Sequence, residues 1–227
     1  MTDLRAARPT VAGALFALLL AGCGAAATPT QRPPPAYPGA LVAPSQLRSP
    51  PALGEAFALD ERVRAETPRG NQEFRAVLQK RGDTLVLVGL GPHGGRGFVL
   101  TERGDEVDFE SHLPEELPFP PRFILHDIQR AWFLGLEGPL PDGEHRAEID
   151  GEEVVERWRG GRLRERTFRR LDGRPAGVIR VEYEGGLGGD EPPSVVRYDN
   201  GWFGYRLVLT TLSHQRIDPT AGGEQGD

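Results

Sequence analysis

The 227-residue sequence has one cysteine, few aromatic residues (7%) and no excess of positive charge, since its net charge is −6. A single cysteine cannot close an internal disulfide, so no disulfide holds this fold together. An acidic balance argues against a nucleic-acid partner, which would require a basic patch. The uncharged apolar run at residues 11–22 would span roughly 18 Å as a helix. That length is well short of the ~30 Å hydrocarbon core, so a permanent transmembrane helix is not expected there.

Motifs typical of catalytic and metal sites are also lacking. The five histidines show no metal-ligand spacing, and no serine stands in a G-x-S-x-G context. Residues 89–94 match G-x-G-x-x-G, but a strand pattern follows them, whereas a dinucleotide loop must lead into a helix. The acidic pairs Glu115-Glu116 and Glu152-Glu153 are typical of solvated surface. We therefore expect no catalytic residue, no metal, no cofactor and no enzymatic activity.

The N-terminus has the build of an export signal, with Arg5 and Arg8 ahead of the short apolar run. Leu20-Ala21-Gly22-Cys23 resembles a bacterial lipobox, in which the cysteine is acylated and becomes the mature N-terminus. Residues 1–22 are then the lipoprotein signal peptide. Cys23 would anchor the chain in a membrane, because anchoring by two or more acyl chains is stable. Gly24 in place of aspartate favours the periplasmic face of the outer membrane. The inner membrane is the alternative location. The alternative to a lipobox is an ordinary signal peptide in which Cys23 is incidental.

Three further segments follow Cys23. Residues 23–53 are rich in Pro and Ala and predict a tether, which could reach roughly 90 Å in an extended polyproline conformation. Residues 54–216 are expected to form one domain, and residues 217–227 a disordered tail.

The domain is mainly β, because alternation of apolar and polar residues dominates its sequence. Phe57, Leu59 and Val63 alternate with charged residues, and so do Phe74 and Leu78. The run at 84–90, TLVLVGL, is apolar on both faces and predicts a central strand that is covered on both sides. More strand patterns bounded by Gly, Pro or Asn-Gly lie between residues 162 and 217.

A helix is expected between these two sets of strands, starting at Pro120-Pro121 and stopping at Gly135. Its two sides differ in polarity. The apolar side is Ile124, Leu125, Ile128, Ala131 and Trp132, and the polar side is His126, Asp127, Gln129 and Arg130. Strands, a helix and strands again predict an antiparallel sheet curled around one or two helices. Such a sheet either closes its core on the helix or leaves an apolar cleft beneath it.

Several stretches resemble the LolB-like lipoproteins, and also a related uncharacterised family of small bacterial lipoproteins. They are EAFALDERV (55–63), FRAVLQKRGDTLVLVGLGPHG (74–94), QRAWFLGLEG (129–138) and GYRLVLTTL (204–212). The resemblance implies a half-open β-barrel of the LolA/LolB type, with an inserted helical lid over an apolar cavity that holds acyl chains. LolB proteins insert the leucine of a Pro-Leu-Gly loop into the membrane. Here the triplet is Pro92-His93-Gly94, so His93 and the nearby Leu90 are the candidates for membrane contact.

The candidate lining residues of that cavity are the apolar residues of the strands and helix. They are Phe57, Leu59, Phe74, Leu78, Leu85, Leu87, Phe98, Leu100, Ile128, Trp132, Ile179, Val181, Leu207 and Leu209. For each of them, ordinary core packing is the alternative.

Two functions of different kind fit these features. The first is a membrane-anchored lipoprotein that binds acyl chains, in transport of lipids or lipoproteins to the outer membrane. Its partners would be the membrane through Cys23, acyl chains of lipids or lipoproteins, and a periplasmic LolA-like carrier. The second is a non-enzymatic structural or assembly lipoprotein that binds another cell-envelope protein.

Overall fold

A computed structural model describes residues 47–91, 94–113, 120–189 and 191–217. Cys23, His93 and the tail after residue 217 lie outside these ranges. No helix in the described residues has the length and hydropathy needed to cross a bilayer.

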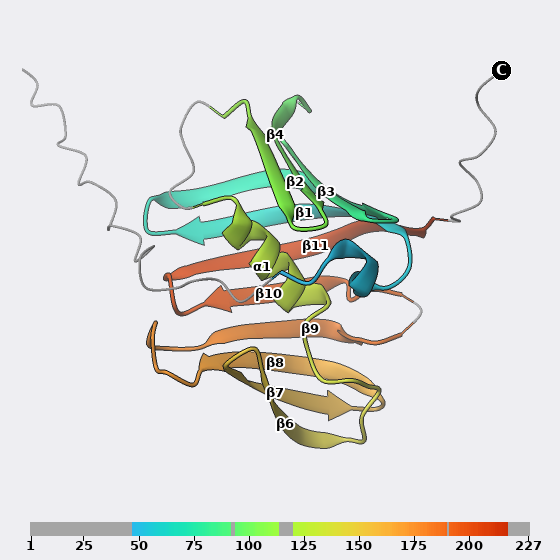
Figure 1. The fold of residues 1–227 in the computed structure, drawn as a ribbon, viewed down its shortest axis with the longest axis vertical. Helices are drawn as coiled ribbons and strands as arrows, with labels where there is room; N and C mark the ends of the chain where they lie inside the picture. The colour runs from blue at the N-terminus through green and yellow to red at the C-terminus, as the bar shows by residue number, and fades with distance from the viewer. Residues whose placement is uncertain (1–46, 92–93, 114–119, 190, 218–227) are drawn as a thin grey trace, which may run out of the picture. The chain divides into compact units, whose positions relative to one another are not determined.

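One antiparallel sheet of eleven strands makes up most of the fold, in the order β5-β4-β3-β2-β1-β11-β10-β9-β8-β7-β6 (Figure 1). The first arm runs from the centre to one edge: β1 (Phe57–Thr67), β2 (Gly70–Arg81), β3 (Thr84–Leu90), β4 (Arg96–Arg103) and β5 (Glu106–Ser111). The second arm returns from the opposite edge: β6 (Gly143–Ile149), β7 (Glu152–Arg159), β8 (Arg162–Arg170), β9 (Ile179–Leu187), β10 (Val195–Asn200) and β11 (Tyr205–Arg216). Pairing of β1 with β11 joins the two arms at the centre.

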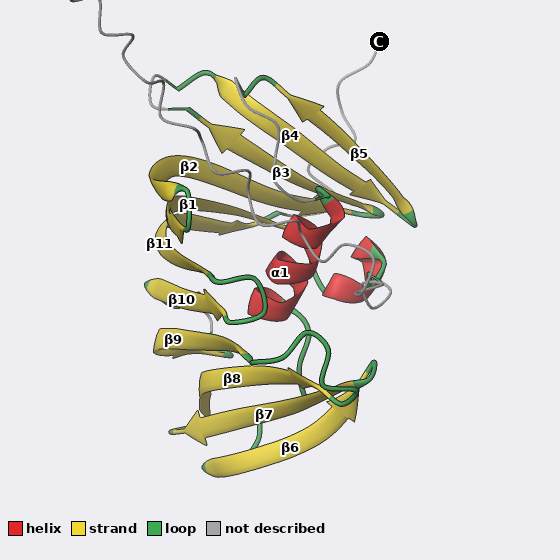
Figure 2. Cartoon of the chain, turned by 90° about the vertical axis from the view of Figure 1, so that its left-hand side faces the viewer, coloured by secondary structure: helices red, strands yellow, loops and turns green. Residues whose placement is uncertain are grey.

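The helix α1 (Arg122–Trp132) lies in the connection between the two edge strands, β5 and β6. A chain that passes from one edge of a sheet to the other must cross one of its faces. Figure 2 shows that the sheet curls around α1 and that the helix lies on one face only. The predicted mainly β fold, an open curled antiparallel sheet with one inserted helix, is therefore confirmed.

The inward face of the sheet carries one continuous apolar core. Alternation decides which residues enter it, because successive side chains of a strand point to opposite faces. Leu59 and Val63 of β1 are buried while Arg62 and Arg64, on either side of Val63, are exposed, as the sequence pattern predicts. Buried residues from both arms and from α1 belong to the same cluster.

The expectation for residues 84–90 is wrong in one respect. They form β3, and Leu85 and Leu87 are buried, but Val86 and Val88 on the other face remain half-buried. The only described helix of the length of α1 lies on the inward face, so no second layer covers the outer side of β3 in the described residues.

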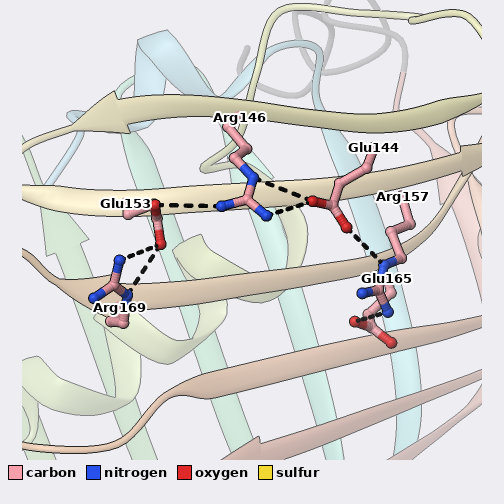
Figure 3. Close-up of polar contacts among 6 residues, drawn as sticks. All are labelled: Glu144, Arg146, Glu153, Arg157, Glu165 and Arg169. Atoms are coloured by element: carbon pink, nitrogen blue, oxygen red, sulfur yellow. Dashed lines mark hydrogen bonds and ion pairs between the residues drawn. The ribbon is translucent and has the colours of Figure 1, made fainter.

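The outer face of the second arm carries a ladder of ion pairs (Figure 3). Arg146 of β6 binds Glu144 of the same strand at 2.6 Å and Glu153 of β7 at 3.7 Å. Arg169 of β8 extends the ladder from Glu153 at 2.8 Å. Arg157 links Glu144 at 3.2 Å to Glu165 at 3.1 Å. Exposed pairs of this kind contribute little each to stability, about 0–1 kcal/mol.

Candidate functional site

The concave face is the candidate site, and α1 meets it in an unexpected orientation. His126, Gln129 and Arg130 are buried, although they belong to the side of the helix that the sequence predicts to be polar. On the apolar side, Leu125 and Ala131 are buried as well, whereas Ile124, Ile128 and Trp132 are half-buried. The sheet therefore receives residues from both predicted sides of α1, and an apolar stripe (Ile124, Ile128 and Trp132) remains partly accessible.

A buried ion pair holds Arg130 against the second arm. Its guanidinium donates from Nη2 to Oε1 of Glu152 at 2.7 Å and from Nε to Oε2 at 3.3 Å. The guanidinium also lies 4.9 Å from the ring centroid of Trp202 and 5.8 Å from that of Phe168. Two aromatic faces and a bidentate carboxylate suit the planar charge of arginine, which explains how it is tolerated in the interior.

A second buried ion pair lies beside the C-terminal end of α1. Arg166 of β8 donates from Nε to Oε1 of Glu156 at 2.7 Å, and from Nη1 to the carbonyl of Arg130 at 3.2 Å. The hydroxyl of Tyr183 donates to the carbonyl of Ala131 at 2.7 Å. The last carbonyls of a helix have no partner within the helix, so these side chains supply the missing hydrogen bonds.

Asp127 makes the third attachment of α1 to the second arm. Its carboxylate accepts hydrogen bonds from the hydroxyls of Tyr198, at 2.6 Å, and Tyr205. Asn200 in turn donates to the Tyr205 hydroxyl at 2.9 Å. Burial raises the pKa of Asp127, while Arg130 and the two tyrosines act in the opposite direction.

The segment that leads into the domain also holds α1. The side-chain amide of Gln129 accepts from the backbone N–H of Arg48 at 2.8 Å and donates to its carbonyl at 2.9 Å. Leu53, at the end of the short helix η1 (Pro50–Leu53), is buried in the core, and η1 lies beside α1 in both views (Figures 1 and 2). The folded domain therefore begins before residue 54, because residues 47–53 pack on it rather than belonging to the tether.

The structure brings the predicted lining residues into one cluster. Nine are buried members of the core: Leu59, Leu78, Leu85, Leu87, Phe98, Leu100, Ile179, Val181 and Leu209. Five are partly buried and pack against it: Phe57, Phe74, Ile128, Trp132 and Leu207. Leu90 is half-buried at the end of β3. The partly buried ones are those that a ligand could reach, and the role of all fourteen as a cavity lining stays a prediction.

Two buried carboxylates on the inward face of the first arm were not predicted from the sequence. Glu61 of β1 is only 5% exposed, and its Oε1 has no hydrogen-bond partner in the described part of the chain. Burial, and secondarily the charge of Asp60, raises the pKa of Glu61 to about 7. Burial also raises the pKa of Glu102 to about 7, against a weak opposing contact from Gln129 at 3.4 Å. Each stands at an apolar position of the strand period, which is the signal that could have revealed them.

His126 of α1 is also buried, and its Nε2 has no partner among the described residues. Burial first, and then the positive charges of Arg130 and Arg122, lowers its pKa to about 3. The ring is therefore neutral at physiological pH and lies against Phe123, with centroids 6.4 Å apart. Among the described residues, no cluster of His, Asp and Glu could hold a metal ion.

Glu61 predicts a pH-dependent difference between the wild-type protein and Glu61→Gln. Because the folded pKa lies above the ordinary value of 4.5, the wild type loses stability as pH rises through the window between 4.5 and about 7. Glu61→Gln should match the wild type near pH 5 and exceed it at pH 8, by no more than about 3 kcal/mol in free energy of unfolding. Urea unfolding at both pH values measures this, and titration of His126 cancels because both proteins contain it.

Glu182→Gln is the control, since Glu182 is exposed on β9. Its stability difference from the wild type should be the same at both pH values. An equal difference for Glu61→Gln at pH 5 and pH 8 would contradict the shifted ionisation of Glu61.

A curled antiparallel sheet that holds the helix α1 on its concave face by buried ion pairs defines the structural class of this protein. The chain belongs to the family described as protein of unknown function (DUF3261), whose sequence profile matches residues 58–213. The expected membership of an uncharacterised family is thereby confirmed.

Comparison with solved structures adds two similar chains. A LolA superfamily protein from Nitrosomonas europaea is 15% identical, with 77% of this chain and 90% of that chain covered and a TM-score of 0.41. A domain described as a putative outer membrane lipoprotein-sorting protein, from Vibrio parahaemolyticus, is 10% identical, with 75% and 88% covered and a TM-score of 0.40. No curated protein matches the chain significantly.

Proposed function

We propose that this protein is a lipid-anchored, non-enzymatic protein of the cell envelope whose concave face binds acyl chains of lipids or lipoproteins. The observation that carries the proposal is the half-buried apolar stripe of α1, made of Ile124, Ile128 and Trp132. An amphipathic helix ordinarily buries its apolar side and exposes its polar side. In this fold the polar residues His126, Gln129 and Arg130 are buried together with part of the apolar side, and the stripe is left half-buried, so it is available to an apolar ligand.

The surroundings of the stripe suit an acyl chain better than a polar substrate. Phe57 and Phe74 of the first arm are partly buried against the same core, and Phe74 lies 6.2 Å from the ring of Phe98. Each methylene that leaves water gains about 0.8 kcal/mol, so several methylenes suffice for useful affinity. Two pairs of charged groups near the helix are engaged with one another, Arg130 with Glu152 and Arg166 with Glu156.

The N-terminal sequence supports an activity at a membrane. Acylated Cys23 would anchor the chain, and about 24 residues from there to the folded domain could span roughly 75 Å when extended. The proposed location is the periplasmic face of the outer membrane, with transport of lipids or lipoproteins as the task and a periplasmic LolA-like carrier as a partner. Leu90 and His93 are the proposed points of membrane contact.

The test uses the chain from residue 24 on, purified from a bacterial periplasm without detergent. Native mass spectrometry should detect co-purified acyl lipids, and a fluorescent fatty acid should bind. Ile128→Glu is expected to weaken fatty-acid binding at least tenfold, because it places a charge on the apolar stripe. Val86→Glu is the matched control, since Val86 is also half-buried but lies on the outer face of β3.

Thermal unfolding of both variants checks that they fold. If Ile128→Glu does not fold, Ile128→Trp takes its place. The larger indole occupies space beside the stripe without adding charge and should also weaken binding. If the folded protein carries no lipid and binds neither added phospholipid nor acylated peptide, acyl binding is refuted.

That refuting result would favour the alternative, an assembly lipoprotein that binds another envelope protein. One observation supports this alternative. Val77, Val88 and Val99 stand directly opposite one another on β2, β3 and β4 and are half-buried on the outer face. Such a row of apolar side chains outside the core is the kind of surface that a protein partner covers.

A further inference from the structure

An open hollow of about 630 Å³ lies where β6 begins and β7 turns into β8. Its lining residues are Gly143, Glu144, Arg157, Trp158, Arg159 and Arg164. Three arginines face one glutamate there, so the lining is positively charged in a chain of net charge −6. The hollow shares no residue with the apolar stripe of α1.

A β-bulge supplies one of the three arginines. Trp158 pairs with Leu163, but Arg157 pairs with Glu165, which leaves Arg164 as an extra residue of β8. The pairing of β8 with β9 skips the same residue. Bulges redirect a side chain out of the regular alternation, and they are common beside binding sites.

Two of the arginines have no carboxylate partner. Arg157 is engaged with Glu144 and Glu165, whereas Arg159 and Arg164 are exposed and form no ion pair within the described ranges. Other arginines on the outer face of this arm differ, because each has a carboxylate oxygen within 4.0 Å. They are Arg146, Arg169, Arg180, Arg197 and Arg206.

Trp158 gives the hollow a rigid wall. It is 8% exposed, and its indole Nε1 donates to Glu156 Oε2 at 2.8 Å. Its ring also lies against Gly138, where an added Cβ would come within 3.0 Å of Cη2. The side chain therefore cannot swing into the hollow and fill it.

We propose that this hollow binds the phosphate group of a phosphate ester, through the guanidinium groups of Arg159 and Arg164 with support from Arg157. Guanidinium groups match phosphate oxygens two at a time, and unpaired arginines make this contact without first breaking an ion pair. The ester has two possible sources, a phospholipid head group at a membrane surface and a soluble phosphate ester. The proposal is independent of acyl binding on the concave face.

The experiment uses the unacylated chain from residue 24 to 227, which keeps every residue that the structure describes. Three probes separate the sources: glycerol 3-phosphate, phosphatidylcholine vesicles, and the same vesicles with phosphatidylglycerol added. Wild type should bind the phosphatidylglycerol vesicles at low salt and lose them at high salt, because exposed charges are screened. Arg159→Gln/Arg164→Gln should weaken this binding at least tenfold.

Arg180→Gln/Arg197→Gln is the control, because it removes the same charge from the same arm outside the hollow. It should keep more than half of the wild-type affinity. An equal loss in both double variants would overturn the proposal in favour of general attraction by positive charge, and so would the absence of binding to all three probes. Binding of glycerol 3-phosphate alone, lost in the first double variant, would support the site and assign it a soluble ester.

If the first double variant melts at a lower temperature than wild type, Arg159→Lys/Arg164→Lys replaces it. This variant keeps the charge and removes the planar fork of donors, so phosphate binding should fall several-fold. Unchanged binding in the lysine variant would overturn the role of the two guanidinium groups.

Discussion

Glu152→Gln is expected to lower the free energy of unfolding by about 3–5 kcal/mol, far more than the loss of an exposed carboxylate would cost. Glu152 is 1% exposed and is the bidentate partner of Arg130. Glutamine keeps the shape but removes the charge, which leaves a buried guanidinium uncompensated. Asp127 cannot replace Glu152, because it is 3.9 Å from Arg130 and already accepts from two tyrosines. Guanidinium chloride unfolding followed by tryptophan fluorescence measures the loss.

The neighbouring residue supplies a matched control. Glu153 points to the opposite face, is 25% exposed as a side chain, and pairs with Arg169 and Arg146. Glu153→Gln should change the free energy of unfolding by less than about 1 kcal/mol. Equal effects at the two positions would show that the interior pair is not what holds α1.

A double replacement separates the charge from the packing. Arg130→Met/Glu152→Met removes both charges and keeps apolar volume, so it should be less destabilising than Glu152→Gln alone. A double variant that is no more stable than the single one would mean that the ion pair itself, and not the cost of an unpaired charge, stabilises the fold.

These attachments also bear on how a ligand would enter. The polar side of α1 is tied to β7, β8, β10 and β11 through Glu152, Arg166, Tyr198 and Tyr205. Gln129 also ties the helix to the backbone of Arg48. With so many buried polar contacts to break, we infer that α1 stays fixed on the sheet and that binding would adjust the partly buried apolar residues around it.

The local pattern of the sequence predicts most strands but neither β6 nor β7, and it predicts the orientation of the helix only in part. Alternation places Leu59, Leu78 and Phe98 inward, and Pro120-Pro121 marks the start of the helix, because both signals are local, whereas α1 ends at Trp132 and not at Gly135. The burial of Arg130 depends on Glu152, which is 22 residues away and reaches it only through the return of the chain along β7. Periodicity alone therefore assigns Arg130 to solvent and Glu152-Glu153 to one exposed pair, although the two glutamates lie on opposite faces.

In the candidate site too, some features follow from the local sequence pattern and others depend on tertiary contacts. The sequence indicates which apolar residues form the core, since all fourteen predicted lining residues lie in or against one cluster. It does not separate the fully buried Ile179 from the half-buried Trp132, because exposure depends on how far the two arms curl. Nor does it indicate the hollow at Arg159 and Arg164, which depends on a bulge.

Gly135→Ala is expected to lower the free energy of unfolding by about 3 kcal/mol or more. Gly135 follows α1, and a Cβ built there would come within 2.2 Å of Arg166 Nη2 and 2.3 Å of Glu156 Oε1. The sequence marks this glycine as a helix stop, but the structure shows that absence of a side chain is required for close approach to a buried ion pair. Overpacking a core costs about 1–3 kcal/mol, and separating a buried pair about 3–5 kcal/mol.

Gly95→Ala is the control, because an added Cβ there meets nothing within 4 Å, and its effect should stay within about 0.5 kcal/mol. Thermal and denaturant unfolding of both variants test the expectation. Gly135→Ala/Arg166→Met removes the guanidinium that the new methyl group meets, so the two replacements should cost less together than the sum of their separate effects. Strict additivity would contradict direct contact between position 135 and the ion pair, and would attribute the role of Gly135 to backbone conformation alone.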